Sequence, residues 1–189
     1  MPAAPYRKYV LLDRDGVLNE NVAGGYVTSV DMLHVLPGAA EAVASLNRAG
    51  YGILVASNQQ GVGKGIMSRH DLDLLSETLR DRIRESSGGE ILEFLYCTHL
   101  ASDNCECRKP RPGLLEEAQR RYGFNLHETY FVGDSYTDLV TAKNAGCPSI
   151  LVLSGQDAHR YLAGETPPVQ ADLVAKDLAD AVNQMLQSD

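Results

Sequence analysis

Two aspartates separated by one residue follow a short apolar run near the start of the chain. The run Val10–Leu12 is apolar and β-prone, which predicts a buried strand that ends at Asp13. In extended backbone Asp13 and Asp15 project to the same side. Two carboxylates this close repel unless a cation lies between them or one is protonated. Both arrangements suit phosphate chemistry, in which a Mg2+ site accompanies one nucleophilic carboxylate and one acid/base carboxylate. The pair alone is equally compatible with a solvated turn.

Polar side chains also follow three other predicted strands. Residues 57–61 (Ser-Asn-Gln-Gln-Gly) follow the second strand, Arg108 and Lys109 lie beyond the third, and residues 133–138 follow the fourth. The carboxyl ends of parallel strands lie along one edge of a doubly wound sheet. We therefore expect all four groups to meet at that edge.

The chemistry that this set predicts is phosphoryl transfer to a carboxylate. Asp13 and Asp134 could hold Mg2+ through oxygen. The Ser57 hydroxyl and the Lys109 ammonium could neutralise phosphoryl oxygens. Asp15 could protonate the leaving oxygen and then deprotonate the water that hydrolyses the aspartyl phosphate.

Three of the four cysteines lie within eleven residues, together with one histidine. Cys97, His99, Cys105 and Cys107 form the pattern Cys-x-His-x5-Cys-x-Cys, whereas Cys147 lies apart and is expected in the core. In a chain expected to be cytoplasmic, clustered cysteines suggest metal before disulfide. Three thiols and an imidazole match a closed structural zinc site, which would fold a polar loop that leads directly into the basic residues.

The elements that must position these groups alternate between strand and helix. Strands are expected over residues 9–12, 52–56, 91–96, 129–132, 150–153 and 172–174, and helices over 37–49, 68–86, 112–122, 136–145 and 176–186. Such alternation predicts an α/β fold, with a parallel sheet covered by helices on both faces. No gap between elements is large enough for a second domain, so residues 1–189 are expected to form one domain. The longest irregular stretches are residues 19–36, 100–111 and 154–170.

Composition narrows the possible partners. The net charge of −8 argues against a surface that coats nucleic acid. The sequence has no apolar run long enough to cross a bilayer, and residues 1–8 lack an apolar signal segment, so a cytoplasmic location is expected. No heptad or apolar stripe is left over, and a monomer is the simplest expectation.

The four motifs, in this order, resemble those of the haloacid dehalogenase superfamily of phosphatases. Residues 13–17 (Asp-Arg-Asp-Gly-Val) are similar to its first motif, Ser57 to its second, Lys109 to its third and residues 133–138 to its fourth. The resemblance covers roughly residues 8–153. It implies a three-layer, Rossmann-like sheet with helices on both faces, with a zinc-binding loop and without a cap domain.

Site roles follow from the resemblance. It implies that Asp13 is the nucleophile, that Asp15 is the acid/base, and that Mg2+ is held by Asp13, Asp134 and the backbone carbonyl of Asp15. Ser57 and Lys109 would complete the catalytic set, and Asp138 would support the site from behind.

Within this family, the residues around the motifs most resemble members that hydrolyse D-glycero-D-manno-heptose 1,7-bisphosphate to the heptose 1-phosphate. That resemblance implies a small phosphorylated metabolite as the partner, with Arg108 recognising the sugar phosphate. The implied substrate-binding residues are Gly24, Gly25, Tyr26, Ser57, Asn58, Gln59, Gln60, Arg108, Lys109 and Ser135.

Two alternatives stay open. Only five residues separate His99 from Cys105, which is more similar to family members that hydrolyse histidinol phosphate. A different class is a regulatory domain that accepts a phosphoryl group on Asp13 without turnover. Such receiver-like domains usually lack an aspartate at the position of Asp15, because they do not need hydrolysis.

Overall fold

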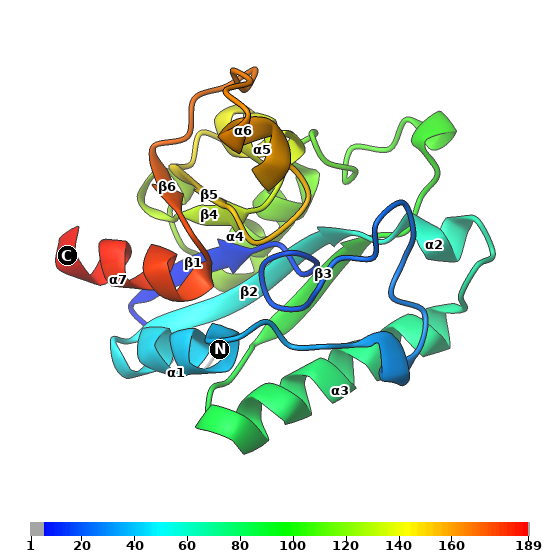
Figure 1. Ribbon diagram of the computed structural model, residues 1–189, viewed down its shortest axis with the longest axis horizontal. Helices are drawn as coiled ribbons and strands as arrows, with labels where there is room; N and C mark the ends of the chain where they lie inside the picture. Colours follow the sequence, from blue (N-terminus) through cyan, green and yellow to red (C-terminus); the bar gives the residue numbers. More distant parts are fainter. Residues whose placement is uncertain (1–5, 189) are drawn as a thin grey trace.

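A single parallel sheet forms the centre of the molecule. The structure is a computed structural model and describes residues 6–188. The strand order is β3-β2-β1-β4-β5-β6, with β1 near the centre (Figure 1). Strands β2 and β3 lie on one side of β1 and strands β4 to β6 on its other side, so the strand order switches beside β1. Ligand sites of open α/β sheets lie at such a switch point. The strands are β1 (Lys8–Leu12), β2 (Tyr51–Asn58), β3 (Glu93–Cys97), β4 (Phe131–Gly133), β5 (Ser149–Val152) and β6 (Leu173–Ala175).

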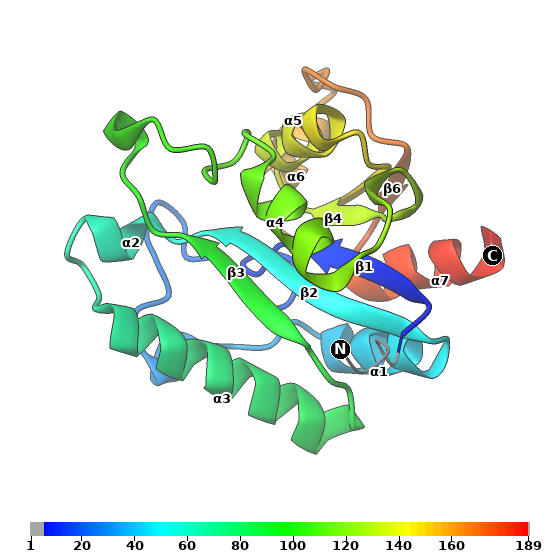
Figure 2. The ribbon, with the colours of Figure 1, turned by 180° about the vertical axis from the view of Figure 1, so that it is seen from behind.

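Helices cover both faces of this sheet. They are α1 (Ala39–Arg48), α3 (Arg69–Ser87), α4 (Gly113–Tyr122), α5 (Tyr136–Ala145) and α7 (Leu178–Ser188). Because side chains alternate along a strand, Val10 and Leu12 of β1 pack with α1, α3 and α7 in one core. Tyr9 and Leu11 pack with α4 and α5 in a second core on the other face, which Figure 2 shows from behind. The predicted three-layer α/β fold is confirmed.

Local signals fix the helix ends. A capping box starts α3, since the Ser68 hydroxyl accepts from the Asp71 backbone N–H and the Asp71 carboxylate accepts from the Ser68 backbone N–H. The structure has a second such box, from Ser135 to Asp138, at the start of α5. Every predicted strand and helix is present, with ends that lie within two residues of those expected.

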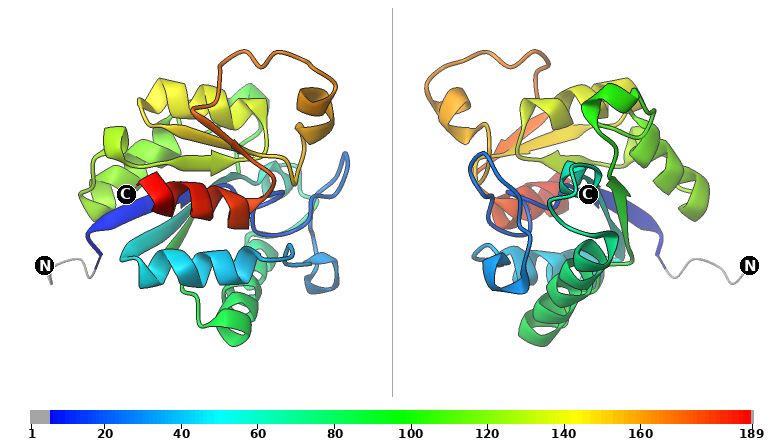
Figure 3. Two further views of the ribbon diagram at one scale, coloured as in Figure 1. Left: turned by 60° about the vertical axis from the view of Figure 1, so that its left-hand side comes forward. Right: turned by 90° about the vertical axis from the view of Figure 1, so that its right-hand side faces the viewer.

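The connections that follow β1 and β2 contain little regular structure. Residues 13–38 contain only the 3-10 turn η1 (Val30–Met32), and residues 59–68 contain only α2 (Gln60–Gly63). The helical element in each connection is only three or four residues long. A further short helix, α6 (Ala158–Leu162), lies close to the loop after β1 (Figure 3). The helices of residues 6–188 include none that is long and apolar enough to span a membrane.

Candidate active site

Three carboxylates and one ammonium form a buried cluster at the carboxyl edge of the sheet. Asp13 follows β1, and its Oδ2 lies 2.8 Å from Nζ of Lys109. The same Nζ lies 2.6 Å from Oδ1 of Asp138, on α5. Asp134 follows β4, and ligand atoms of Asp13, Asp134 and Asp138 all lie within 4.8 Å of one another. Three negative charges against one positive charge leave an excess of two negative charges in a buried site, which is the deficit that a divalent cation would fill.

Burial and this excess of negative charge raise the pKa values of two carboxyl groups in the cluster. Burial raises the pKa of Asp13 to about 6, although the charge of Lys109 and hydrogen bonds from Lys109 and Ser57 oppose the rise. Burial, with the charges of Asp138 and Asp13, raises the pKa of Asp134 to about 8. The pKa of Lys109 is raised, because its two carboxylate partners outweigh its own burial. Without a cation, Asp134 therefore keeps its proton at neutral pH, which lowers the negative charge of the cluster.

Asp134 is oriented by two loops that lie far apart in the sequence. Its Oδ2 accepts hydrogen bonds from Nδ2 of Asn21 at 2.7 Å and from the backbone N–H of Gln156 at 2.5 Å. Both bonds use one oxygen, so Oδ1 remains available to a metal ion. A Cβ atom would lie 2.1 Å from Oδ2 if placed on Gly16 and 2.0 Å if placed on Gly155. Only glycine fits at these two positions, so the loop after β5 is part of the site.

Asp15 lies beside this cluster and is held by three side chains. Arg14 donates from Nη2 to Oδ2 at 2.9 Å and from Nε to Oδ1 at 3.2 Å. The amide of Gln59 donates to Oδ2 at 2.8 Å, and the amide of Asn19 donates to Oδ1 at 2.8 Å. The Gln59 amide also lies 3.2 Å from Oγ of Ser57. The Gln59 amide thus connects Asp15, the candidate acid/base, with Ser57 of the second motif.

Two residues predicted to bind substrate, Asn58 and Ser135, make hydrogen bonds within the site. The side-chain amide of Asn58 brackets the backbone of Lys109, donating to its carbonyl and accepting from its N–H, each at 3.1 Å. The buried hydroxyl of Ser135 donates to Oδ2 of Asp138 at 2.7 Å. Asn58 therefore positions Lys109, and Ser135 positions Asp138.

Ser57, Gln59 and Lys109 lie at or beside the buried cluster described above, and the other predicted substrate residues lie in two places. Gly24, Gly25 and Tyr26 line a cleft of about 950 Å³. Nζ of Lys64, also in the lining, sits 5.4 Å from the centre of the Tyr26 ring. Residues 154–156 form part of the opposite wall, so the cleft adjoins Asp134. Gln60 and Arg108 lie outside this lining, and Nη2 of Arg108 is 3.5 Å from Oε1 of Gln60.

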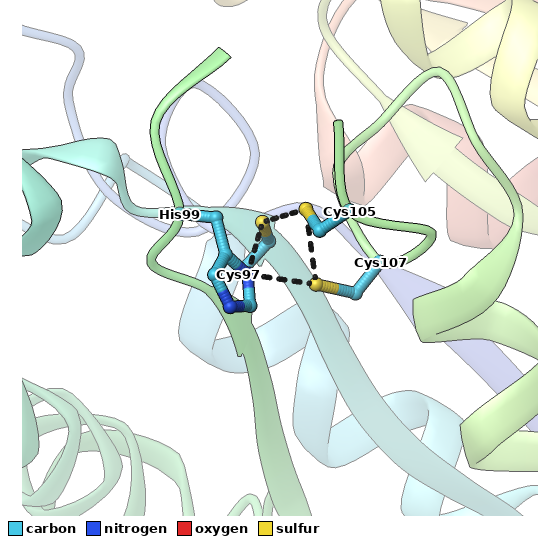
Figure 4. Close-up of side chains that lie close together, drawn as sticks. All are labelled: Cys97, His99, Cys105 and Cys107. Atoms are coloured by element: carbon cyan, nitrogen blue, oxygen red, sulfur yellow. Dashed lines mark hydrogen bonds between the residues drawn. The ribbon is translucent and has the colours of Figure 1, made fainter. Parts of the chain in front are cut away.

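The Cys/His loop brings its four side chains together (Figure 4). Sγ of Cys97 lies 3.6 Å from both Nδ1 of His99 and Sγ of Cys105. Sγ of Cys107 lies 3.2 Å from that nitrogen and 3.5 Å from Sγ of Cys105. A tetrahedral zinc site with ordinary bond lengths has edges of about 3.5–3.8 Å between its ligand atoms. The cysteines are free thiols, so the cluster fits a metal ion rather than a disulfide. Cys147 is buried in the core, as expected.

The pKa of the Cys107 thiol also indicates that this loop binds a metal ion. Burial and the neighbouring thiols Cys97 and Cys105 raise the pKa of Cys107 to about 12. Three thiolates cannot form side by side unless a cation offsets their charge. Cys107 lies two residues before Lys109, so an ion in the loop would help to hold the backbone of Lys109 in place.

Some residues of the site were missed by the sequence analysis. Arg14 and Asn19 bind Asp15, while Asn21 and residues 154–156 bind Asp134 or line the cleft. A signal existed for residues 154–156, because polar residues at the end of the fifth strand must reach the same sheet edge. Asn21 lies in a loop without periodicity, which left no comparable signal.

Comparisons with known proteins agree with this geometry. Residues 106–181 match the HAD-hydrolase-like family model. The chain is 36% identical over 181 residues to D-glycero-β-D-manno-heptose-1,7-bisphosphate 7-phosphatase of Pseudomonas aeruginosa, covering 96% of this chain and 99% of that protein.

Solved structures give the same picture. The D,D-heptose 1,7-bisphosphate phosphatase of Bordetella bronchiseptica, in a crystal structure with magnesium and phosphate, superimposes with a TM-score of 0.89 at 35% identity, covering 96% of this chain and 99% of that one. The corresponding enzyme of Burkholderia thailandensis gives a TM-score of 0.71 at 30% identity, with coverage of 95% and 99%. The chain therefore belongs to the HAD-like phosphatase family.

Proposed function

We propose that this chain is a Mg2+-dependent phosphatase of D-glycero-D-manno-heptose 1,7-bisphosphate, which it converts to the heptose 1-phosphate. The observation that carries the proposal is the convergence of Asp13, Asp134 and Lys109 in one buried cluster, with Asp15 beside it. The names of the relatives described above support the choice of substrate and of the 7-phosphate as the group removed.

The reaction proceeds in two steps on Asp13. Its carboxylate oxygen attacks phosphorus, the bond from phosphorus to the sugar oxygen breaks, and Asp15 gives its proton to that oxygen. The products are the free alcohol and an aspartyl phosphate. Asp15 then takes a proton from water as the water oxygen attacks phosphorus, which releases inorganic phosphate and restores the carboxylate of Asp13. Lys109 and Ser57 donate to the phosphoryl oxygens in both steps.

Two metal ions complete the proposal. Mg2+ would be held by Asp13, Asp134 and the backbone carbonyl of Asp15, and when bound it offsets the repulsion between a carboxylate nucleophile and an anionic phosphate. The excess of two negative charges in the cluster supports this site. Zn2+ would be held by the four residues of the Cys/His loop, where it has a structural role.

Substrate recognition would come from loops within one capless domain, residues 1–189. The connections after β1 and β2 support this, since their helical elements are only three and four residues long. The sugar would lie along Gly24–Tyr26 and the pair Gln60 and Arg108, with Arg108 binding the distal phosphate. We further propose a cytoplasmic monomer whose partner is a small phosphorylated metabolite, neither nucleic acid nor membrane.

One observation favours a second substrate. The short segment between His99 and Cys105 supports histidinol phosphate as the alternative. Both reactions use the same chemistry, so the site geometry does not separate them.

The experiment is phosphate release by the purified protein with Mg2+, from both anomers of the heptose bisphosphate and from histidinol phosphate. Asp13→Asn is the control, because it removes the nucleophile while retaining the shape of the side chain. A preference of more than about tenfold in kcat/KM, or ~1.4 kcal/mol, for one heptose anomer is expected. A preference for histidinol phosphate would replace the proposed substrate, and full activity of Asp13→Asn would overturn the mechanism.

A further inference from the structure

Arg14, the residue between the two aspartates, is sealed inside the protein. Its side chain is 1% exposed. The guanidinium lies 5.8 Å from the centre of the Tyr96 ring, on β3, and the Tyr96 hydroxyl is hydrogen-bonded to Ser76 on α3 at 2.8 Å. A buried charge of this kind is costly unless it is paired. Its position therefore requires an explanation in terms of its partners.

The only ion-pair partner of Arg14 among residues 6–188 is Asp15. The guanidinium approaches the carboxylate as a fork, with Nη2 at 2.9 and 3.0 Å from its two oxygens and Nε at 3.2 Å. The side-chain amide of Gln59 bonds to both partners: its Oε1 accepts from Nη2 of Arg14 at 3.1 Å, and its Nε2 donates to Oδ2 of Asp15 at 2.8 Å. The carboxylate cannot rotate without breaking several of these bonds at once.

Asp15 nevertheless faces outward, with 24% of its side chain exposed. Arg14 is behind it and cannot reach a substrate. A planar guanidinium fork fixes the plane of a carboxylate, whereas an ammonium makes a single point contact. Arg14 can therefore influence chemistry only through the orientation of Asp15.

We infer that Arg14 is a positioning residue that holds the carboxyl group of Asp15 in line with the oxygen of the leaving alcohol. The inference rests on the proposed phosphatase function. General acid catalysis contributes about 10²–10⁴-fold to a rate, and a displacement of about 1 Å costs about 10²-fold. Loss of the fork should therefore weaken proton transfer while leaving Asp13, Lys109 and the metal site in place.

The test uses two leaving groups that differ in their need for a proton. An alkyl phosphate, here the heptose bisphosphate, must have its leaving oxygen protonated, whereas 4-nitrophenyl phosphate releases a stable anion. First-turnover product formation is measured by rapid mixing with Mg2+ for wild type, Arg14→Lys and Arg14→Met. We expect the alkyl ester rate to fall about 10²-fold and the nitrophenolate burst to fall less than about tenfold.

The inference is judged by the ratio of the alkyl ester rate to the nitrophenyl ester rate. Both rates are measured on the same protein sample, so an inactive, unfolded fraction lowers both amplitudes equally and does not change the ratio. Arg14→Lys provides a milder variant if Arg14→Met folds poorly. Arg80→Lys is the matched control, since Arg80 also lies over an aromatic ring, 5.2 Å from Phe94, and donates to the Ile91 carbonyl at 3.2 Å. It should leave the ratio unchanged.

Equal losses for both esters would overturn the inference and make Arg14 a purely structural residue. Unchanged rates in both variants would overturn it as well. Wild-type protein that releases product from neither ester would overturn the proposed function itself, which separates that failure from failure of the inference.

Discussion

At the residue scale, charge balance decides how the site behaves. Asp13 and Asp138 both pair with one buried cation, Lys109, and Asp134 lies within 4.8 Å of both carboxylates, so each carboxylate depends on the others. The identities of these residues follow from the sequence motifs, because each follows a predicted strand. Their mutual distances do not, since they depend on how the strand ends are staggered in the sheet.

Lys109→Met is expected to lower kcat about 10²–10³-fold, because the phosphoryl oxygens lose a preorganised cation. Steady-state kinetics with Mg2+ measures this loss. Lys143→Met, which changes an exposed lysine on α5, is the control. Normal turnover of Lys109→Met would remove Lys109 from the catalytic set.

The raised pKa values predict how pH and Mg2+ act together. Asp134 binds its proton more tightly in the folded protein, since its pKa rises from 3.8 to about 8. Its contribution to the free energy of unfolding therefore falls as pH rises through this interval. Mg2+ binds the ionised form, so the rise in Tm caused by Mg2+ should grow between about pH 5 and pH 8.

Thermal unfolding with and without added Mg2+, on protein that retains its loop metal, measures this effect. Asp134→Asn should show a smaller dependence on pH. A Mg2+ shift that is constant with pH in wild type would contradict the assignment of the raised pKa to the metal site.

At the element scale, strands and helices were predictable because their signals are local. The apolar runs, the capping box at Ser68 and the glycine after α4 each act within a few residues, so every element appears in the expected place. The short helices α2 and α6 were not predicted, since four or five residues give no periodicity. The contact of Asn21 with Asp134 depends on tertiary folding and left no sequence pattern, whereas the position of Gly155 after the fifth strand offered a signal.

The loop after β5 is predicted to control metal binding through Gly155. Gly155→Ala places a methyl group 2.0 Å from Oδ2 of Asp134, so Asp134 must move. We expect Mg2+ affinity to fall at least about tenfold, or ~1.4 kcal/mol, measured by titration of activity with Mg2+. Gln156→Ala retains the backbone N–H that binds Asp134 and is the control. Unchanged Mg2+ affinity in Gly155→Ala would show that this loop does not constrain the ligand.

The Cys/His loop is predicted to act on catalysis at a distance. Cys107→Ser should lose bound zinc and lower kcat about 10²-fold, because the backbone that carries Lys109 is no longer held. Metal analysis and kinetics are measured together. Cys147→Ala, which changes the cysteine outside the cluster, should retain zinc and activity. Full activity in a zinc-free Cys107→Ser variant would separate the loop from catalysis.

At the scale of the whole molecule, the fold brings residues from four strand ends and two distant loops to one edge of a sheet. The motif order indicated this edge and the family, and the structure and the relatives confirm both. The substrate contacts stay predictions: Gly24, Gly25 and Tyr26 line the cleft, whereas Asn58 and Ser135 are hydrogen-bonded to Lys109 and Asp138. Residue type alone does not separate a substrate contact from a support.

The central claim is that Asp13 is the phosphoryl acceptor. The most direct measurement is acid quenching during turnover, followed by mass analysis of the peptide that contains residues 13–17. We expect a base-labile phosphoryl group on Asp13 in wild type, and neither label nor turnover in Asp13→Asn. Rapid phosphate release by Asp13→Asn, or a phosphoryl group found on another residue, would contradict it.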